Sequence, residues 1–364
     1  MWRSLRWARQ QGGGSRCDNH VEDTNMTQIS VALIGYGYWG PNLARNFHQL
    51  HTCHLAAVCD QDLSRLAEVK RLYPTSHTTT NYRELLSDPN IEATIIATPA
   101  QTHHALVRES LLSGKHVLVE KPLALSSAQA KELIEIAARQ KKILMVGHIF
   151  EYNPAVHKIK ELMSGDQIGD LYYIYSTRVN LGRIQSDLNA LWSIAPHDIS
   201  ILIFLLESMP LEVSARGASY LNKSVEDVVF VNLVFPKGII AQVHGSWLDP
   251  SKVRRMTVVG SRKMIVYDDV DDEGKVKVYE KGVYRKGDDI YGEFQYKLHS
   301  GDIHIPKIDM TEPLRNECSH FIECIQQGKK PLTDGENGLR VVRVLEAAQK
   351  SLENRGAVVE IERR

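Results

Sequence analysis

Short apolar runs alternate with amphipathic segments over the first part of the chain, from residue 29 to residue 147. The runs are almost continuous, as expected of parallel strands covered on both faces, and lie at residues 29–34, 55–59, 91–97, 116–119 and 143–146. Segments with helical periodicity lie between them, at residues 41–50, 63–72, 103–112 and 128–139. This alternation predicts a parallel α/β sheet with right-handed crossover connections.

After residue 147 the pattern changes to long β-like runs, several of which alternate apolar and polar residues. The runs are separated by turns rather than helices and lie at residues 171–180, 211–220, 228–235, 239–247, 256–259 and 264–267. Two helical segments follow at residues 312–327 and 335–354. Alternation is typical of antiparallel strands with one covered face. We predict an α/β domain at residues 27–148 and an α+β domain with an open, mainly antiparallel sheet at residues 149–364.

An open sheet leaves one face to be covered by something other than its own helices. Within residues 239–247, Val243, Gly245 and Trp247 share one face of the predicted strand. We predict that this face forms the contact of a homodimer or homotetramer, and that residues 149–364 serve both oligomerisation and substrate binding.

Residues 1–26 differ from the rest, because they are basic, then glycine-rich, then polar, with no apolar segment typical of a secretory signal. We interpret them as a disordered extension. The remaining composition excludes several classes of protein. With 44 Lys and Arg against 44 Asp and Glu, no excess charge favours nucleic acid or an anionic membrane. The chain lacks an apolar run of membrane-spanning length, and its five cysteines contain neither a CxxC pair nor metal-ligand spacing, which predicts reduced thiols in a cytoplasmic protein without a metal site.

A glycine-rich motif follows the first predicted strand: Gly35-Tyr36-Gly37-Tyr38-Trp39-Gly40 has the form GxGxxG and opens a helix. Asp60 ends the second predicted strand, 20 residues beyond Gly40. This context predicts a Rossmann dinucleotide-binding domain, with the pyrophosphate at the helix N-terminus and Asp60 on the adenine ribose. The Asp60 carboxylate favours NAD over NADP, whereas Arg65, five residues further on, weakens that preference because it could pair with a 2′-phosphate.

Two later segments predict the chemistry. Residues 95–105 (IIATPAQTHHA) lead from the fourth predicted strand into a loop, and Glu120-Lys121-Pro122 ends the next strand. Ligands of open α/β sheets bind at this carboxyl edge. A lysine there can bind a substrate hydroxyl and accept its proton, provided that burial or neighbouring charge lowers its pKa.

In this order and spacing, GYGYWG, ATPAQTHHA and GKHVLVEKPLA closely resemble the Gfo/Idh/MocA family of sugar and polyol oxidoreductases, and the resemblance extends from about residue 28 to residue 352. It implies that Lys121 takes part in catalysis and contacts nicotinamide, and that the Lys121–Pro122 bond is often cis. The implied cofactor-binding residues are Gly35, Gly37, Tyr38, Trp39, Gly40, Asp60, Thr98, Pro99, Thr102, His103, Glu120, Lys121 and Pro122.

The family's second catalytic motif is D-x-x-x-H at the start of a helix, and residues 191–198 (LWSIAPHD) match it. The resemblance implies that His197 is an acid/base on the substrate hydroxyl. Ser193 stands where the family has aspartate, and serine can hydrogen-bond but cannot hold the charge. Three explanations stay open: Asp198 compensates, Lys121 and His197 suffice, or the protein is a catalytically impaired NAD-binding sensor.

Within the family, residues 145–154, 178–182, 195–198 and 246–250 most resemble bacterial dehydrogenases of nucleotide sugars, in particular UDP-N-acetylglucosamine 3-dehydrogenases. The implied reaction oxidises UDP-GlcNAc to UDP-3-keto-GlcNAc, a ketone suited to transamination in lipopolysaccharide or lipid A biosynthesis. The alternative enzyme is an inositol or free-sugar dehydrogenase. Candidate substrate residues are Tyr152, Asn153, Arg178, Asn180, His197, Lys252 and Arg254, although Tyr152 equally suits packing and the basic cluster equally suits a solvated face.

Overall fold

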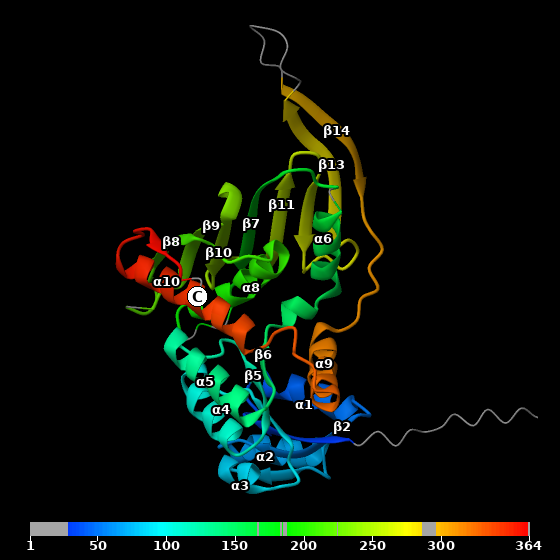
Figure 1. The fold of residues 1–364 in the computed structure, drawn as a ribbon, viewed down its shortest axis with the longest axis vertical. Helices are drawn as coiled ribbons and strands as arrows, with labels where there is room; N and C mark the ends of the chain where they lie inside the picture. Colours follow the sequence, from blue (N-terminus) through cyan, green and yellow to red (C-terminus); the bar gives the residue numbers. More distant parts are fainter. Residues whose placement is uncertain are drawn as a thin grey trace, which may run out of the picture.

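The computed structural model describes residues 28–362 except 166, 183, 185–187, 224 and 286–295. Its N-terminal part, at the bottom of Figure 1, is a six-stranded parallel sheet with the order β3-β2-β1-β4-β5-β6. The strands are β1 (Ile29–Ile34), β2 (Cys53–Cys59), β3 (His77–Thr79), β4 (Ala93–Ile96), β5 (His116–Glu120) and β6 (Leu144–Gly147). The order reverses between β1 and β4, which is the switch point of a Rossmann fold. The predicted parallel α/β sheet is confirmed.

The helices that connect these strands agree with the predicted periodic segments to within two residues. They are α1 (Gly40–Gln49), α2 (Leu63–Leu72), α4 (His103–Leu112) and α5 (Ser127–Gln140), with a short 3-10 turn η1 (Ala100–Thr102). Sequence periodicity missed β3 and α3 (Tyr82–Ser87). Both elements are too short to show a period, and β3, with the sequence HTT, lies at the sheet edge where no continuous apolar run is needed.

The second domain contains a nine-stranded sheet in its described part, with the order β14-β13-β12-β11-β7-β10-β9-β8-β15. The strands are β7 (Leu171–Val179), β8 (Glu212–Ala218), β9 (Val228–Val234), β10 (Ile240–Ser246), β11 (Val253–Gly260), β12 (Met264–Asp268), β13 (Val276–Arg285), β14 (Tyr296–His304) and β15 (Val359–Glu360). Within this described sheet every neighbouring pair is antiparallel except β7 and β10. The predicted mainly antiparallel sheet is confirmed, although β13, β14 and β15 were not predicted.

One correction concerns the helices of this domain. Residues 149–206 contain η2 (Ile149–Tyr152), α6 (Pro154–Ser164), α7 (Ala190–Ser193) and α8 (Ala195–Leu206), and η3 (Pro236–Gly238) follows later. The prediction expected turns between the β-runs, and it missed α8 by periodicity because its core is apolar nearly all round: Ile199, Ser200, Ile201, Leu202, Ile203 and Leu205 are all buried. A helix buried on every side shows no amphipathic period.

A second correction concerns the face of β10 that was predicted to contact another subunit. Val243, Gly245 and Trp247 are buried within the chain, on the side where α7 and α8 pack. A Cβ at Gly245 would lie 3.4 Å from the Ile194 side chain. The uncovered side of the sheet instead presents Tyr173, Tyr175, Phe230, Ile240 and His244, since strand alternation gives two faces but not which face the helices cover.

The C-terminal helices connect the second domain back to the first. Helix α9 (Pro313–Gln327) packs on α1, where the rings of Phe47 and Phe321 lie 6.4 Å apart, and α10 (Gly335–Glu353) packs on α5 and β6. Between them, the Thr333 carbonyl accepts a hydrogen bond of 2.8 Å from the amide of Val146 in β6. Figure 1 shows both helices, in orange and red, at the junction of the two sheets. The two domains are thereby held together.

Candidate active site

A cleft of about 1590 Å³ lies at the carboxyl edge of the parallel sheet and extends to the second domain. A drug-sized ligand fills about 300–1,000 Å³, so the cleft has room for a dinucleotide and part of a second molecule. Of the predicted cofactor-binding residues, the cleft is lined by Gly35, Gly37, Tyr38, Trp39, Asp60, Thr98, Pro99, Thr102, Glu120, Lys121 and Pro122. These residues come from the ends of four strands, which the parallel topology brings to one edge.

The glycine loop requires its glycines for backbone geometry. Gly35 has φ +100, and a Cβ there would lie 2.6 Å from the Ala97 carbonyl oxygen. Gly40 lies behind the loop, where a Cβ would clash with the Gly35 carbonyl, so its missing side chain allows α1 to pack closely on this turn. The close packing of α1 on this turn places the N-terminus of the helix beside the glycine loop that lines the cleft.

Asp60 is 9% exposed and its two oxygens are already engaged. Its Oδ2 accepts the amide of Tyr36 at 2.6 Å and its Oδ1 accepts the amide of Asp62 at 2.9 Å. The Arg65 guanidinium lies 3.4 Å from both oxygens. Arg65 therefore pairs with Asp60, which offsets part of the negative charge that a 2′-phosphate would meet.

The loop after β4 is fixed to the lysine loop by a buried histidine. His103 places Nδ1 2.7 Å from the Pro122 carbonyl and Nε2 2.9 Å from the Thr98 carbonyl. Thr98 and Thr102 join their hydroxyls at 2.6 Å. His103 was predicted to bind the cofactor, but it is 1% exposed and does not line the cleft. It holds together two loops that do.

Lys121 crosses the cleft and contacts the second domain. Its Nζ donates a hydrogen bond of 2.9 Å to the main-chain carbonyl of Ser193, at the end of α7. Burial and the Arg178 charge lower the pKa of Lys121, while the Glu120 carboxylate opposes that shift. The Lys121–Pro122 peptide bond is cis.

His197 lies in the first turn of α8, as the motif implied. Its ring meets the Phe150 ring edge-on at 5.1 Å. Burial and the charges of Lys121 and Arg178 place the pKa of His197 well below its usual range, so the imidazole is neutral. In the part of the chain that the structure describes, Nδ1 of His197 has no hydrogen-bond partner. Ser193 lines the same cleft, but it contributes its carbonyl to Lys121 rather than a carboxylate to His197.

The suggestion that Asp198 replaces the missing aspartate is wrong. Asp198 faces β7, where its Oδ2 accepts Nε of Arg178 at 2.7 Å and its Oδ1 accepts the hydroxyl of Ser176 at 2.7 Å. Both oxygens are therefore occupied by side chains of β7. Residues at i and i+1 on a helix point in different directions, which is the physical reason.

The predicted substrate residues divide into two groups. Asn153, Arg178, Asn180, His197 and Arg254 line the cleft, whereas Tyr152 and Lys252 do not. Arg178 is only 8% exposed and is paired with Asp198. Arg254 lies 3.3 Å from Asp269, a cleft residue that no sequence motif indicated. Asp269 follows β12, and only the pairing of β11 with β12 brings it to Arg254.

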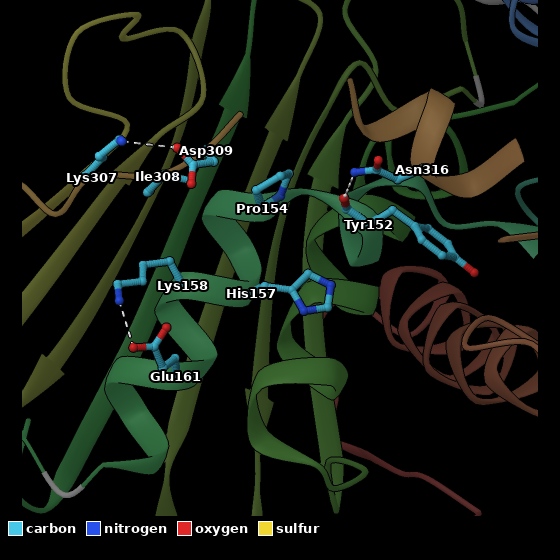
Figure 2. Close-up of a pocket in the computed structure, with 9 residues that line it drawn as sticks. All are labelled: Tyr152, Pro154, His157, Lys158, Glu161, Lys307, Ile308, Asp309 and Asn316. Carbon is cyan, nitrogen blue, oxygen red and sulfur yellow. Dashed lines mark hydrogen bonds and ion pairs between the residues drawn. The ribbon is translucent and has the colours of Figure 1, made fainter. Parts of the chain in front are cut away.

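A smaller pocket of about 480 Å³ lies beside η2 and is shown in Figure 2. Tyr152 lines this pocket, where its carbonyl accepts the Asn316 amide at 3.2 Å, while its ring points away from the pocket. The Tyr152 hydroxyl lies 3.2 Å from that of Thr333. The predicted alternative for Tyr152, packing, therefore describes it better than substrate contact. Two pairs of opposite charge belong to the pocket, Lys158 with Glu161 and Lys307 with Asp309.

No group of three or more His, Cys, Asp or Glu side chains is placed to hold a metal ion among the described residues. No helix in that same part of the chain is both long and apolar enough to cross a membrane.

The fold and cleft define a class, a two-domain NAD-binding oxidoreductase, and comparison with known proteins agrees. Residues 29–148 match the model described as "Oxidoreductase family, NAD-binding Rossmann fold", and residues 160–361 match "Oxidoreductase family, C-terminal alpha/beta domain". The chain therefore belongs to the Gfo/Idh/MocA family.

The proteins to which this chain is similar are named for different substrates. UDP-N-acetylglucosamine 3-dehydrogenase of Acidithiobacillus ferrooxidans is 24% identical over 263 residues, 71% of this chain and 79% of that protein. Its solved structure has a TM-score of 0.75 at 22% identity, covering 91% of this chain and 99% of that one. Myo-inositol 2-dehydrogenase of Thermotoga maritima is 25% identical over 341 residues, 91% of this chain and 98% of that protein. Levoglucosan dehydrogenase, solved as a complex with NADH, has a TM-score of 0.78 at 18% identity, covering 93% of this chain and 100% of that one.

Proposed function

We propose that this protein oxidises a hydroxyl of a nucleotide sugar with NAD, and that the reaction is UDP-GlcNAc to UDP-3-keto-GlcNAc. One observation carries the dehydrogenase chemistry: Lys121 from the first domain and His197 from the second line the same cleft, and both have lowered pKa values. A lowered pKa increases the fraction of each group that is deprotonated at a given pH, and only the deprotonated form can accept the proton of a hydroxyl.

The cofactor fits the cleft on the observations above. The turn at Gly35 and Gly37 and the start of α1 would hold the pyrophosphate, and Asp60 would face the adenine ribose. The Asp60 carboxylate favours NAD over NADP, even with Arg65 paired to it. When bound, the nicotinamide ring accepts a hydride from the carbon that carries the reacting hydroxyl.

Lys121 would act as the base and His197 would orient the hydroxyl or share its proton. The carbonyl of Ser193 holds Nζ of Lys121 at 2.9 Å without adding a negative charge that would raise the lysine pKa. This arrangement supports the explanation that Lys121 and His197 suffice. A bound sugar hydroxyl could also supply a partner to His197, whose ring otherwise lacks one at Nδ1 among the described residues.

The nucleotide sugar is supported by the relative named UDP-N-acetylglucosamine 3-dehydrogenase and by the polar lining opposite Lys121. Asn180 and Arg254 supply amide and guanidinium groups for hydroxyls or a pyrophosphate, whereas the side-chain amide of Asn153 is already bonded to Tyr267 and to the Ala155 amide. Lys252, which is exposed and outside the cleft, is left out of this proposal.

The test is the appearance of NADH with UDP-GlcNAc, with myo-inositol as the competing substrate and Ser193→Asp as a paired variant. Turnover of UDP-GlcNAc by the wild type supports the proposal. If only Ser193→Asp turns over, the site is correct and the wild-type chain is a disabled form. If neither protein oxidises UDP-GlcNAc, the substrate assignment fails.

Two alternatives have specific support. The myo-inositol 2-dehydrogenase relative covers 91% of this chain, so oxidation of myo-inositol without UDP-GlcNAc would favour a polyol dehydrogenase. Ser193 and the unpartnered Nδ1 of His197 favour an NAD-binding sensor. NAD binding without oxidation of any sugar would identify that sensor.

We also propose that the chain forms a homodimer or homotetramer through the uncovered sheet face. That face presents Tyr173 and Tyr175, whose rings stack at 6.2 Å, and Phe230 and His244, whose rings stack at 4.3 Å. Light scattering should give at least a dimer, and Tyr175→Glu should dissociate it. A monodisperse wild-type monomer contradicts this assembly.

A further inference from the structure

The His197 ring has no polar anchor at Nδ1 in the described part of the chain. This nitrogen is buried and has no hydrogen-bond partner there, so the hydroxyl of Ser193, one helical turn earlier, does not bond to it. The ring nevertheless lines the same cleft as Lys121. Because Nδ1 is buried, Nε2 is the ring nitrogen that can meet a ligand. Rotation of a histidine ring about its second side-chain torsion has a broad energy profile, so the orientation of His197 has to come from its packing contacts.

Phe150 of η2 supplies a directional contact of this kind. The centroids of the Phe150 and His197 rings lie 5.1 Å apart, and the two ring planes are inclined at 68°, which is an edge-to-face arrangement. Phe150 is 9% exposed and also lines the cleft. Edge-to-face pairs at this separation attract each other in a preferred geometry, whereas the burial of an aliphatic side chain has no preferred direction. The Phe150 ring therefore favours one orientation of the imidazole.

Phe150 is itself held at its ring face by a cation. Cζ of Arg178, in β7, lies 4.4 Å from the centroid of the Phe150 ring. A guanidinium is attracted to an aromatic face within about 6 Å, and the attraction is stronger where water is excluded. The Arg178 side chain is 9% exposed, so little water competes for it. The position of the Phe150 ring thus depends on how Arg178 is fixed.

Asp198 fixes Arg178. Nε of Arg178 donates to Oδ2 of Asp198 at 2.7 Å, and Nη2 donates to Oδ1 at 3.2 Å. The hydroxyl of Ser176 donates to Oδ1 of Asp198 at 2.7 Å. Pairing through two nitrogens sets the plane of the guanidinium as well as its position. Because Asp198 directly follows His197 in α8, the contacts from His197 to Phe150, Arg178 and Asp198 return to the turn of the helix where they began.

We propose that Phe150, held in place by the Arg178–Asp198 ion pair, fixes the orientation of the His197 imidazole and keeps water from Nδ1. Phe150 is then a positioning residue that acts through His197. Asp198 acts on Arg178 and not on the imidazole, so it gives His197 no negative charge to share. His197 offers Nε2 to the cleft from one ring position, as a neutral hydrogen-bonding group. This inference deepens the proposed function, and only its kinetic consequence rests on that function.

The charges around His197 agree with a neutral ring. The groups that act on its pKa come from four elements, and they are Lys121 after β5, His148 before η2, Arg178 in β7 and Arg254 in β11. Together with burial, each of them lowers the pKa of His197. An imidazolium enclosed by Phe150 would have little water to stabilise it. Removal of the Phe150 ring would admit water to Nδ1, and the pKa of His197 should rise.

The chain offers a matched arrangement outside the cleft. His157 of α6 meets the ring of Phe204 in α8 at 5.1 Å and 66°, and Nζ of Lys160 lies 4.1 Å from the centroid of the Phe204 ring. There, however, Nε2 of His157 lies 2.7 Å from the main-chain oxygen of Glu151. His157 therefore has a polar anchor in addition to its aromatic contact. Phe204→Leu removes the same kind of ring as Phe150→Leu and serves as its control.

The test is nitrogen magnetic resonance of the full-length protein with isotopically labelled histidines and no sugar present. The His197 signal is the one that disappears in His197→Gln. Wild-type His197 should be neutral at about pH 6, and in Phe150→Leu it should titrate with a pKa higher by about one unit or more. Phe204→Leu should leave the His197 signal unchanged. A wild-type His197 that is protonated at about pH 6, or a titration in Phe150→Leu equal to that of the wild type, overturns the proposal.

A second measurement does not depend on the folding of any Phe150 variant. In wild-type protein with labelled phenylalanine rings and labelled histidine nitrogens, solid-state spectra should show a dipolar coupling between His197 and a phenylalanine ring. The coupling should persist when NAD binds, because the cofactor does not replace this contact. The absence of the coupling overturns the proposal.

The kinetic consequence separates positioning from direct contact with the sugar. Phe150→Leu should lower kcat with UDP-GlcNAc by about 10- to 100-fold, because a misoriented His197 no longer meets the reacting oxygen, while KM changes little. Phe204→Leu should change neither quantity. A raised KM with unchanged kcat would mean that Phe150 only packs against the sugar, and it overturns the positioning role. If the wild type oxidises no sugar, the proposed function fails, whereas the resonance experiments still decide this inference.

Discussion

The two walls of the cleft are built in different ways. The cofactor wall consists of short local segments, such as Gly35–Gly40 and Glu120–Pro122, each of which ends a strand of one parallel sheet. The opposite wall is assembled from residues far apart in sequence, such as Asn180, His197 and Arg254, which sheet register and helix packing bring together. Local sequence motifs therefore reveal the cofactor side of the cleft. On the substrate side, the charged side chains already form ion pairs with one another.

The largest expected effect is on the cofactor wall at Lys121. Lys121→Met should lower kcat by about 10²–10⁴-fold, because the proton acceptor is lost, while NAD binding changes only slightly. Steady-state kinetics and calorimetric titration separate the two quantities. Because the pKa of Lys121 is lowered, wild-type kcat/KM should rise as pH increases through that pKa and then level off. Full activity of Lys121→Met would remove the lysine from the mechanism.

The opposite wall should respond in stability, since its charges pair with one another. Asp198→Ala leaves the buried Arg178 charge uncompensated, which should lower the free energy of unfolding by about 3–5 kcal/mol. Asp269→Ala breaks the more exposed pair with Arg254 and should cost at most about 1 kcal/mol. Denaturant unfolding measures both. Equal losses for the two variants would contradict the assignment of Asp198 as structural.

A smaller effect is expected where the walls meet, at Glu317. A carboxyl whose folded pKa is raised contributes stability at low pH and loses it as pH rises towards the folded pKa. The wild type should therefore lose stability relative to Glu317→Gln by about 1.4 kcal/mol per pH unit from about pH 5 upward. Unfolding curves of both proteins at several pH values test the slope, and parallel curves would mean that Glu317 carries no proton.

The smallest effect is expected at Asp60. Asp60→Ala removes the carboxylate and leaves Arg65 free to pair with a 2′-phosphate, so the NAD to NADP preference should fall by about tenfold. The ratio of kcat/KM values, or of cofactor dissociation constants, measures this change. Because Asp60 also accepts the Tyr36 amide, Asp60→Asn serves as the control that keeps one acceptor. An unchanged ratio in both variants would remove Asp60 from cofactor selection.

Sequence patterns predicted the Rossmann sheet, the mainly antiparallel sheet and both C-terminal helices. An element with one exposed face shows a hydrophobic periodicity in its own sequence, which identifies it as a helix or a strand. The same reasoning missed α8 and assigned β10 the wrong face. Helix α8 is buried on nearly all sides and has no period, and both faces of β10 carry apolar residues. In each case the missing information was which element packs against which.

The sequence alone determined the site features that follow directly from a strand and the residues next to it. These are the turn at Gly35, the carboxylate after β2 and the lysine after β5. Only the tertiary structure decided how distant side chains divide their partners. It paired Asp198 with Arg178 rather than His197, and it supplied the Ser193 carbonyl to Lys121. It also buried Glu317 with neither carboxyl oxygen hydrogen-bonded in the described part of the chain. The physical reason is that hydrogen bonds and charge interactions act over a few ångströms in space, and spacing along the chain does not give those distances.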